Sequence, residues 1–281
     1  MPELHRAGKP TLHYALDDYT DPWRDAPHLI LQHGYGRSGR FWYSWVPYLS
    51  RFYKVVRPDL RGLGQSGIPD DLETGLNVEA YIDDLLAIID ALGGGPVHYC
   101  GESLGGILGM VLAAQHPQRL RTLSLVAAPL LINQDTQRAF AFDHPTWQDA
   151  LRTMGSRKWA EAANSATRFP DGTDPGLLAW YADEMGKSPV EVLIRMSRIA
   201  SSVDATPYID RIKTPTLGLY PEHAPVTIQS QEQTLKERIA SLKIVHVPSR
   251  HHTIQNLMPA TLAKAVLHFA AQHDGVACRE P

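Results

Sequence analysis

The sequence predicts an α/β protein whose mostly parallel sheet is covered by helices on both faces and interrupted by one helical insertion. Short apolar runs of strand type alternate with amphipathic helical patterns in the first half of the chain. This alternation stops from about residue 130 to residue 207 and then resumes. With 281 residues, 43% of them hydrophobic, the chain can bury one sizeable core without disulfides.

The strand and helix patterns follow one another as right-handed crossover connections between parallel strands require. The clearest helix spans 78–92, where apolar residues recur at helical spacing, and it stops at the glycines and proline of 93–96. The predicted strands are 28–32, 54–57, 96–100, 123–126, 216–220 and 243–247, and the predicted helices are 78–92, 104–115, 228–239 and 259–271.

The interruption defines the expected domain organisation. Residues 1–129 and 208–281 form the predicted α/β core, and residues 130–207 form a predicted helical cap. The cap is rich in tryptophan and methionine, which indicates a buried pocket that tolerates apolar or aromatic groups. Cap core packing accounts for part of this signal.

Composition excludes several classes of function. The net charge is −3 and no basic run is present, which argues against a nucleic-acid partner. No apolar run reaches 18 residues and the first residues lack a signal-peptide core, so we expect a cytoplasmic protein with no membrane partner. Cys100 and Cys278 are too few for a disulfide framework, and no cofactor or metal site is expected. Whether the chain forms a homo-oligomer stays open.

The segment 101–105, Gly-Glu-Ser-Leu-Gly, has the pattern of a nucleophile elbow. An apolar strand precedes it and an apolar helix follows it, as this sharp strand-to-helix turn requires. The turn strains its central residue and presents it above the sheet at a helix N-terminus, where backbone N–H groups stabilise negative charge. We therefore predict Ser103 as the nucleophile; the alternative is an ordinary Gly-Ser turn.

A second turn, His33-Gly34-Tyr35-Gly36, follows directly on the predicted strand 28–32. The glycines allow the backbone to turn an N–H toward the substrate oxygen. The backbone N–H groups of Tyr35 and of Leu104, the residue after the nucleophile, are the predicted oxyanion donors. A simple glycine turn is the alternative.

On these motifs the chain resembles the α/β-hydrolase superfamily of esterases, lactonases and carbon–carbon bond hydrolases that carry a helical cap. The resemblance covers nearly the whole length: His33-Gly34, the loop 58–66 (Pro-Asp-Leu-Arg-Gly-Leu-Gly-Gln-Ser), the segment 101–106 and a C-terminal histidine. It implies an α/β-hydrolase fold, and structural roles for Asp59 and Arg61 in the loop.

The resemblance also implies which histidine is the base. The family pattern after the last strand is an apolar residue, Pro, Gly, any residue, Gly and His, with a proline seven positions later. Here Val247-Pro248 opens the segment and Pro259 closes it, so the register selects His252 rather than its neighbour His251.

The acid of the expected triad is the weak point of the resemblance. The family's aspartate position in the segment 221–225 holds Ala224, which has no polar atom. Glu222, two residues earlier, is the first choice for orienting His252. A carboxylate from elsewhere, such as Asp204 or Glu102, is the second, and a Ser–His dyad without an acid is the third.

Together these features predict a serine hydrolase that forms an acyl-enzyme on Ser103. The expected substrate is a small, largely apolar carbonyl compound, an ester or lactone first and the carbon–carbon bond of a diketone second. The competing class is a ligand-binding protein or slow-turnover sensor on the same scaffold, suggested by Ala224, because fold does not fix function.

Overall fold

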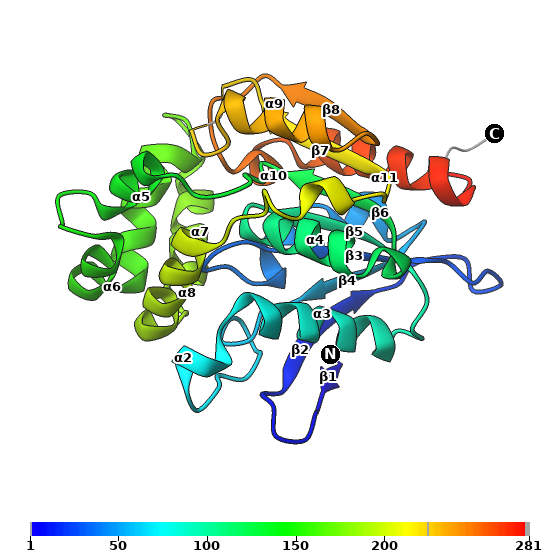
Figure 1. The fold of residues 1–281 in the computed structure, drawn as a ribbon, viewed down its shortest axis with the longest axis horizontal. Coiled ribbons are helices and arrows are strands. Elements are labelled where there is room, and N and C mark those ends of the chain that lie inside the picture. The colour runs from blue at the N-terminus through cyan, green and yellow to red at the C-terminus, as the bar shows by residue number, and fades with distance from the viewer. Residues whose placement is uncertain (1, 224, 279–281) are drawn as a thin grey trace.

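A computed structural model of the protein describes residues 2–223 and 225–278. Its centre is an eight-stranded sheet with the strand order β1-β2-β4-β3-β5-β6-β7-β8 (Figure 1). Strands β1, β2 and β4 pair antiparallel, and every pair from β4 to β8 is parallel. The strands are β1 (Glu3–Leu4), β2 (Leu12–Asp17), β3 (His28–Gln32), β4 (Lys54–Pro58), β5 (Val97–Glu102), β6 (Leu120–Val126), β7 (Thr216–Pro221) and β8 (Leu242–Val247).

Helices cover both faces of the sheet, and a separate hydrophobic core lies on each face. Helices α3 and α4 pack together on one face, whereas α1 and α11 pack together on the other. The helices are α1 (Val46–Leu49), α2 (Leu72–Gly75), α3 (Val78–Ala91), α4 (Leu104–Gln115), α5 (Gln134–Ala141), α6 (Trp147–Ala163), α7 (Pro175–Gly186), α8 (Val190–Ser202), α9 (Gln229–Arg238), α10 (Ile254–Leu257) and α11 (Pro259–Asp274). Short 3₁₀ turns occupy Gly39–Trp42, Pro117–Arg119 and Ile209–Arg211, and a π-helical turn, η3, spans Asn164–Arg168.

This architecture confirms the predicted fold class. Each predicted strand and helix is present, with ends that differ by at most three residues. The first strand pair, β1 and β2, was not predicted. Strand β2 alternates apolar and polar residues only weakly, and it lies near the antiparallel edge of the sheet, where one short strand covers it.

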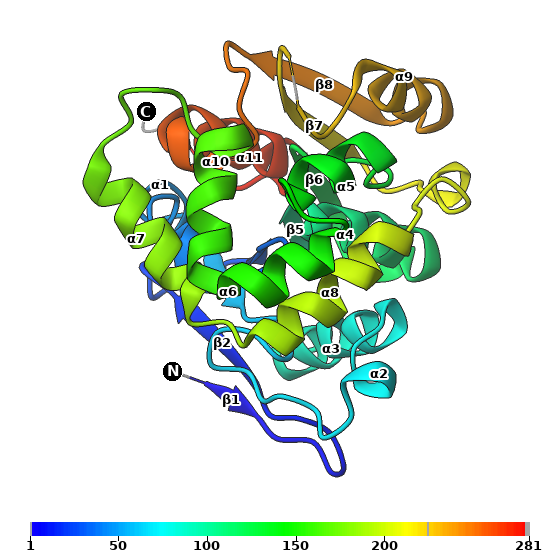
Figure 2. The same ribbon diagram turned by 90° about the vertical axis from the view of Figure 1, so that its left-hand side faces the viewer.

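Four helices, α5 to α8, are inserted between β6 and β7, and we call them the helical insertion. They gather at one end of the sheet, at the left of Figure 1, and this end faces the viewer in Figure 2. Ser103 directly follows β5 at this end, so the insertion lies where the parallel strands finish. The insertion lies within the predicted cap, 130–207, but the exact division of core from cap stays a prediction.

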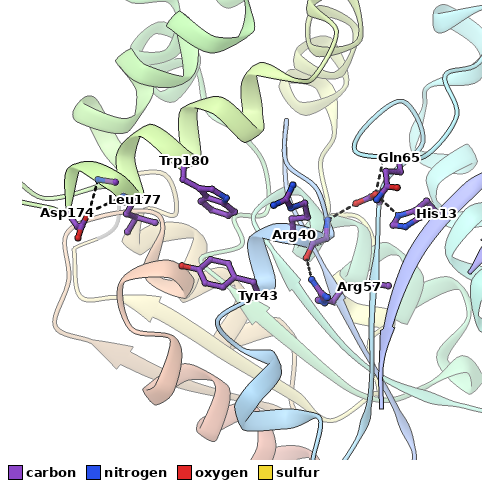
Figure 3. Close-up of a pocket in the computed structure, with 12 residues that line it drawn as sticks. His13, Arg40, Tyr43, Arg57, Gln65, Asp174, Leu177 and Trp180 are labelled. Carbon is purple, nitrogen blue, oxygen red and sulfur yellow. Dashed lines mark hydrogen bonds and ion pairs between the residues drawn. The ribbon is translucent and has the colours of Figure 1, made fainter. Parts of the chain in front are cut away.

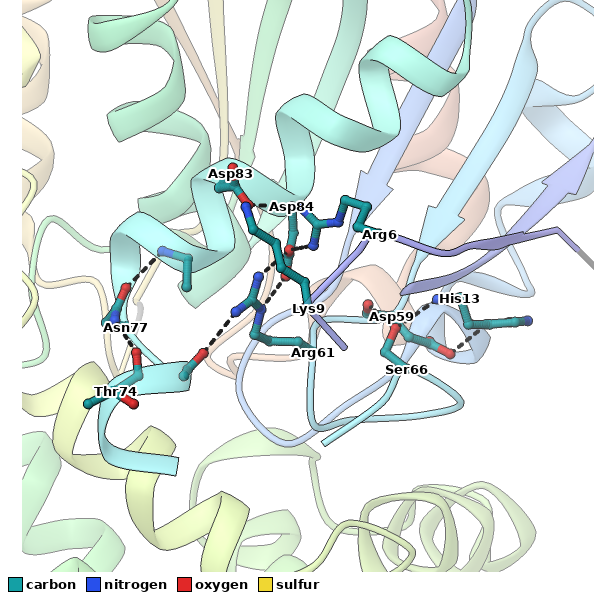
Figure 4. Close-up of polar contacts among 12 residues, drawn as sticks. Arg6, Lys9, His13, Asp59, Arg61, Ser66, Thr74, Asn77, Asp83 and Asp84 are labelled. Atoms are coloured by element: carbon teal, nitrogen blue, oxygen red, sulfur yellow. Dashed lines mark hydrogen bonds and ion pairs between the residues drawn. The ribbon is translucent and has the colours of Figure 1, made fainter. Parts of the chain in front are cut away.

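The loop 58–66 is held by buried polar contacts, several of which are drawn in Figure 4. The Asp59 carboxylate accepts hydrogen bonds from the backbone N–H groups of Gly39 (2.7 Å) and Gln65 (2.9 Å) and lies 2.8 Å from Nδ1 of His13. The Arg61 guanidinium pairs with the buried Asp84 on α3. These contacts indicate that Asp59 and Arg61 stabilise the loop.

None of the helices in the described part of the chain combines the length and the apolar character needed to cross a membrane.

Candidate active site

Ser103 occupies the turn between β5 and α4. Its φ of 53° and ψ of −120° place a non-glycine residue in a strained left-handed conformation. The flanking glycines make the turn possible, because a Cβ on Gly101 would lie 2.3 Å from the carbonyl oxygen of Gly105. A Cβ on Gly105 would lie 2.6 Å from the backbone oxygen of Gln32. The local geometry is therefore that of a nucleophile elbow.

The turn after β3 lies beside this elbow. The His33 ring has a fixed neutral tautomer, because Nδ1 donates to the Gly34 carbonyl (2.8 Å) and Nε2 accepts from the Leu60 N–H (3.0 Å). Burial lowers the pKa of His33 to about 4. Among the described residues, the backbone N–H groups of Tyr35 and Leu104 donate no recorded hydrogen bond. Both residues line the cavity that contains Ser103.

His252 lies in the loop after β8 and lines the same cavity as Ser103. Its backbone N–H donates to the Thr167 carbonyl of η3 (2.9 Å), and its Nε2 lies 3.4 Å from Oε1 of Glu102. Within the described chain, no hydrogen-bond partner is found for its buried Nδ1. His251 instead lines an outer pocket together with Glu222. The structure thus brings His252, and not His251, to Ser103.

A buried ion pair stands next to His252. The Glu102 carboxylate, one residue before the nucleophile, accepts a hydrogen bond from Nη1 of Arg37 through its Oε2. Arg37 also donates from Nε to the Tyr181 hydroxyl on α7, so the pair links the core to the insertion. Burial raises the pKa of Glu102, although Arg37 opposes the shift.

A second buried arginine, Arg168, reaches the cavity from η3. Its guanidinium lies over the rings of Trp159 (5.2 Å) and Tyr181 (5.4 Å). Burial lowers its pKa to about 10, so the side chain stays protonated at neutral pH. The backbone oxygen of Arg168 accepts from the Thr253 hydroxyl (2.5 Å), which ties η3 to the loop that carries His252.

The electrostatic balance of the site favours a neutral base. Burial lowers the pKa of His252 well below its usual 6.5, and the nearby Arg37 and Arg168 lower it further. A neutral imidazole is able to accept a proton from Ser103. The guanidiniums of Arg37 and Arg168 and the carboxyl group of Glu102 therefore lie near a neutral imidazole.

The acid predicted first, Glu222, lies away from this group. It is exposed, and it lines an open pocket of about 450 Å³ with His251 and Ser249. Asp204 is also exposed, where its carboxylate accepts from the Thr206 N–H (2.7 Å). Ala224 lies outside the described residues. Of the three carboxylates considered from the sequence, only Glu102 has a recorded contact with His252.

The cavity at Ser103 is small and mostly apolar. Its volume is about 20 Å³, roughly the space of one water molecule. The helical insertion contributes much of its wall, through Phe140, Trp147, Arg168 and Ala200. The substrate must therefore enter by movement of the insertion or of side chains.

A larger pocket of about 930 Å³ lies elsewhere, beside α7 (Figure 3). Trp180 and Tyr43 line one side of it, with their rings in edge-to-face contact at a centroid distance of 5.2 Å, and Arg40, Arg57 and Gln65 line its other side. Ser103, Leu104 and His252 do not line it. Its size alone does not make it the reaction site, because it holds no activated nucleophile.

A metal site was not expected from the sequence. In the part of the chain that the structure describes, no group of three or more His, Cys, Asp or Glu side chains is placed to hold a metal ion. The side chains at this cavity include a serine hydroxyl, a neutral imidazole and two guanidiniums, and acyl transfer uses groups of these kinds.

Sequence reasoning missed Arg37 and Arg168. Neither arginine belongs to a motif. Because arginines are mostly exposed in folded proteins, the sequence predicts a surface position for both. The burial of both depends on the docking of the insertion against the core, since Tyr181 contacts both guanidiniums. The sequence carries no local signal for that contact.

Comparison with known proteins agrees with the fold. Residues 27–163 match the family model described as the alpha/beta hydrolase fold. A protein of Stutzerimonas stutzeri named "Putative carbamate hydrolase RutD" is 31% identical over 215 residues, which cover 73% of this chain and 76% of the relative. The chain therefore belongs to the α/β-hydrolase family, and the resemblance seen in its motifs is confirmed.

Two solved structures are similar to this chain over nearly its whole length. The enol-lactonase from Burkholderia xenovorans superposes with a TM-score of 0.84 at 25% identity, covering 95% of this chain and 99% of that one. A hydrolase from Pseudomonas aeruginosa gives a TM-score of 0.82, also at 25% identity, with 95% and 97% covered.

Proposed function

We propose that the protein is a serine hydrolase that cleaves small esters or lactones through an acyl-enzyme on Ser103. The observation that carries the proposal is the strained Ser103 at the start of α4, in one cavity with the buried His252. Strain of this kind persists where the surrounding structure holds a residue for function.

In the proposed reaction, Nδ1 of His252, the ring nitrogen that Glu102 does not contact, takes the hydroxyl proton as the Ser103 oxygen bonds to the substrate carbonyl carbon. The backbone N–H groups of Tyr35 and Leu104 hold the resulting oxyanion. His252 then gives the proton to the leaving oxygen as its bond to carbon breaks. Water, deprotonated by His252, hydrolyses the acyl-enzyme and restores the Ser103 hydroxyl.

We assign Glu102 as the positioning carboxylate for His252, in place of Glu222. The 3.4 Å separation of Glu102 Oε1 and His252 Nε2 supports this choice, since catalytic contacts are often long before substrate binds. Glu102 also supplies the negative charge that an imidazolium needs in the transition state. Glu222 stays a prediction from the sequence, with its exposed position against it.

The substrate class follows from the site and from the relatives. An enol-lactonase is among the similar structures, which supports esters and lactones. The relative named as a carbamate hydrolase suggests carbamates as a further class of substrate, because Ser103 could attack their carbonyl carbon in the same way. We further propose that the helical insertion acts as a cap over Ser103, because its side chains close the cavity.

The proposal is tested by labelling and by turnover. A fluorophosphonate should add one covalent group, which peptide mass spectrometry should locate on Ser103. A panel of small esters, lactones, carbamates and a diketone should reveal repeated turnover of at least one ester or lactone. Labelling at another residue, or no turnover of any compound in the panel, would contradict the proposal.

The pH profile provides a separate prediction. Because the pKa of His252 is lowered well below 6.5, its neutral form persists into mildly acidic solution. We expect kcat/KM for a neutral ester to stay level from pH 8 to below pH 6.5 and to fall only at more acidic pH. The measurement is kcat/KM against pH, with the uncatalysed rate subtracted. An acidic limb centred at pH 6.5 or higher would contradict this prediction, because it would show that burial and the two arginines do not lower the pKa of His252.

A further inference from the structure

Arg168 lacks a carboxylate partner in the described structure. Each of the other buried arginines, Arg37 and Arg61, forms an ion pair, with Glu102 and Asp84 respectively. Arg168 is 2% exposed, yet its recorded side-chain hydrogen bonds among the described residues go only from Nη1, to Asn164 Oδ1 (3.4 Å) and Met185 Sδ (3.1 Å). Burying a charge with such weak partners costs folding free energy unless a ligand of opposite charge pairs with it.

The position of Arg168 indicates where a ligand of its guanidinium would bind. The residue lines the cavity of Ser103 and His252, so a group bound to it would lie beside the reacting atoms. The rings of Trp159 and Tyr181 hold the guanidinium in place through cation–π contacts and leave its donors for another partner. A planar guanidinium matches a carboxylate through two parallel hydrogen bonds.

The charge balance supports the same ligand. Arg37 and Arg168 contribute two positive charges near His252, and Glu102 contributes one negative charge. A bound carboxylate would bring the site to neutrality before the imidazolium and oxyanion form as a pair. The substrate itself would then offset a cation that makes protonation of His252 unfavourable.

We propose that Arg168 binds a carboxylate on the substrate, so that the enzyme acts on small anionic esters or lactones. This inference rests on the proposed function and narrows its substrate class. The sequence suggested a largely apolar substrate; the aromatic wall of the cavity still suits an apolar body, but the guanidinium requires an acidic end. Because Arg168 lines the same cavity as Ser103 and His252, a short chain between the two groups is favoured.

The test compares two series of esters with the same shape. Monoethyl malonate, succinate and glutarate carry a carboxylate, and their primary-amide counterparts carry a neutral group of the same size. Ethanol release gives kcat/KM for each pair. We expect the wild type to favour the best acid over its amide about 10- to 100-fold, the range of a charge-assisted pair.

Arg168→Met should lower kcat/KM for the acid about 10- to 100-fold more than it lowers kcat/KM for the amide. Arg168→Lys should recover part of the loss, because it keeps the charge without the planar fork. Arg138→Met, which changes an exposed arginine of the same insertion, is the matched control and should leave both rates unchanged. A structural role would instead lower both rates equally.

Two results would overturn the inference while Ser103 chemistry stands: an acid-to-amide ratio near one in the wild type, or an equal loss on both esters in Arg168→Met. If no ester is turned over, the proposed function fails separately. The anion subsite is then judged by calorimetric titration of monoethyl malonate into Ser103→Ala, with and without Arg168→Met. Binding that disappears with Arg168→Met supports the subsite, and equal or absent binding in both proteins overturns it.

Discussion

Replacing Ser103 by alanine should lower kcat by about 10⁴-fold or more on every ester that the wild type hydrolyses, as removal of the nucleophile does in serine proteases. The hydroxyl is the only group that the substitution removes, and the acyl-enzyme cannot form without it. The oxyanion donors and the binding cavity remain, so the residual rate should still exceed the rate in water. Steady-state and burst kinetics measure both quantities.

The fold should tolerate this substitution. The strained backbone is imposed by the packing of Gly101 and Gly105 around the turn and does not depend on the hydroxyl. Ser124, a buried serine on the neighbouring strand β6, provides a matched control, and Ser124→Ala should keep kcat within about threefold, because it removes no reacting group. Substantial activity in Ser103→Ala, with a folded protein by circular dichroism, would place the nucleophile elsewhere.

The sequence was informative where the chemistry depends on neighbours along the chain. The elbow needs a strand, two glycines and a helix within 101–115, so Ser103 and α4 could be predicted from that stretch alone. His252 could be predicted because its register relative to Pro248 and Pro259 resembles that of the family. The mostly parallel sheet could be predicted from the alternation of strand and helix patterns.

The sequence was less informative where the chemistry depends on docking. Arg168 lies in a π-helical turn, and such turns have no simple sequence signal although they are frequent at functional sites. Its proximity to His252 depends on two contacts between η3 and the loop after β8: Thr167 with the His252 backbone, and Arg168 with Thr253. The same limit applies to the acid, since Glu102 and His252 are far apart in the chain.

Replacing Glu102 by glutamine should lower kcat about 10²- to 10⁴-fold, approaching the effect of removing the acid of a Ser-His-Asp triad. Glutamine keeps the shape and can still accept a hydrogen bond from Arg37, but it cannot balance the positive charge of an imidazolium. Since a nearby negative charge favours protonation, its loss should also move the acidic limb of kcat/KM to still lower pH. Glu222→Gln, the matched control, should change kcat less than about threefold, because Glu222 is exposed.

A purely structural role for Glu102 requires its own test, because the substitution leaves Arg37 buried without a counter-charge. Losing one member of a buried pair costs about 3–5 kcal/mol of unfolding free energy. The double variant Glu102→Gln with Arg37→Met removes both charges and should recover stability in thermal or urea unfolding. If Glu102 only neutralises Arg37, the double variant should recover kcat as well; if Glu102 positions His252, kcat should stay low. A large loss in Glu222→Gln with little change in Glu102→Gln would instead return the role to Glu222 and require the loop after β7 to close over His252 during the reaction.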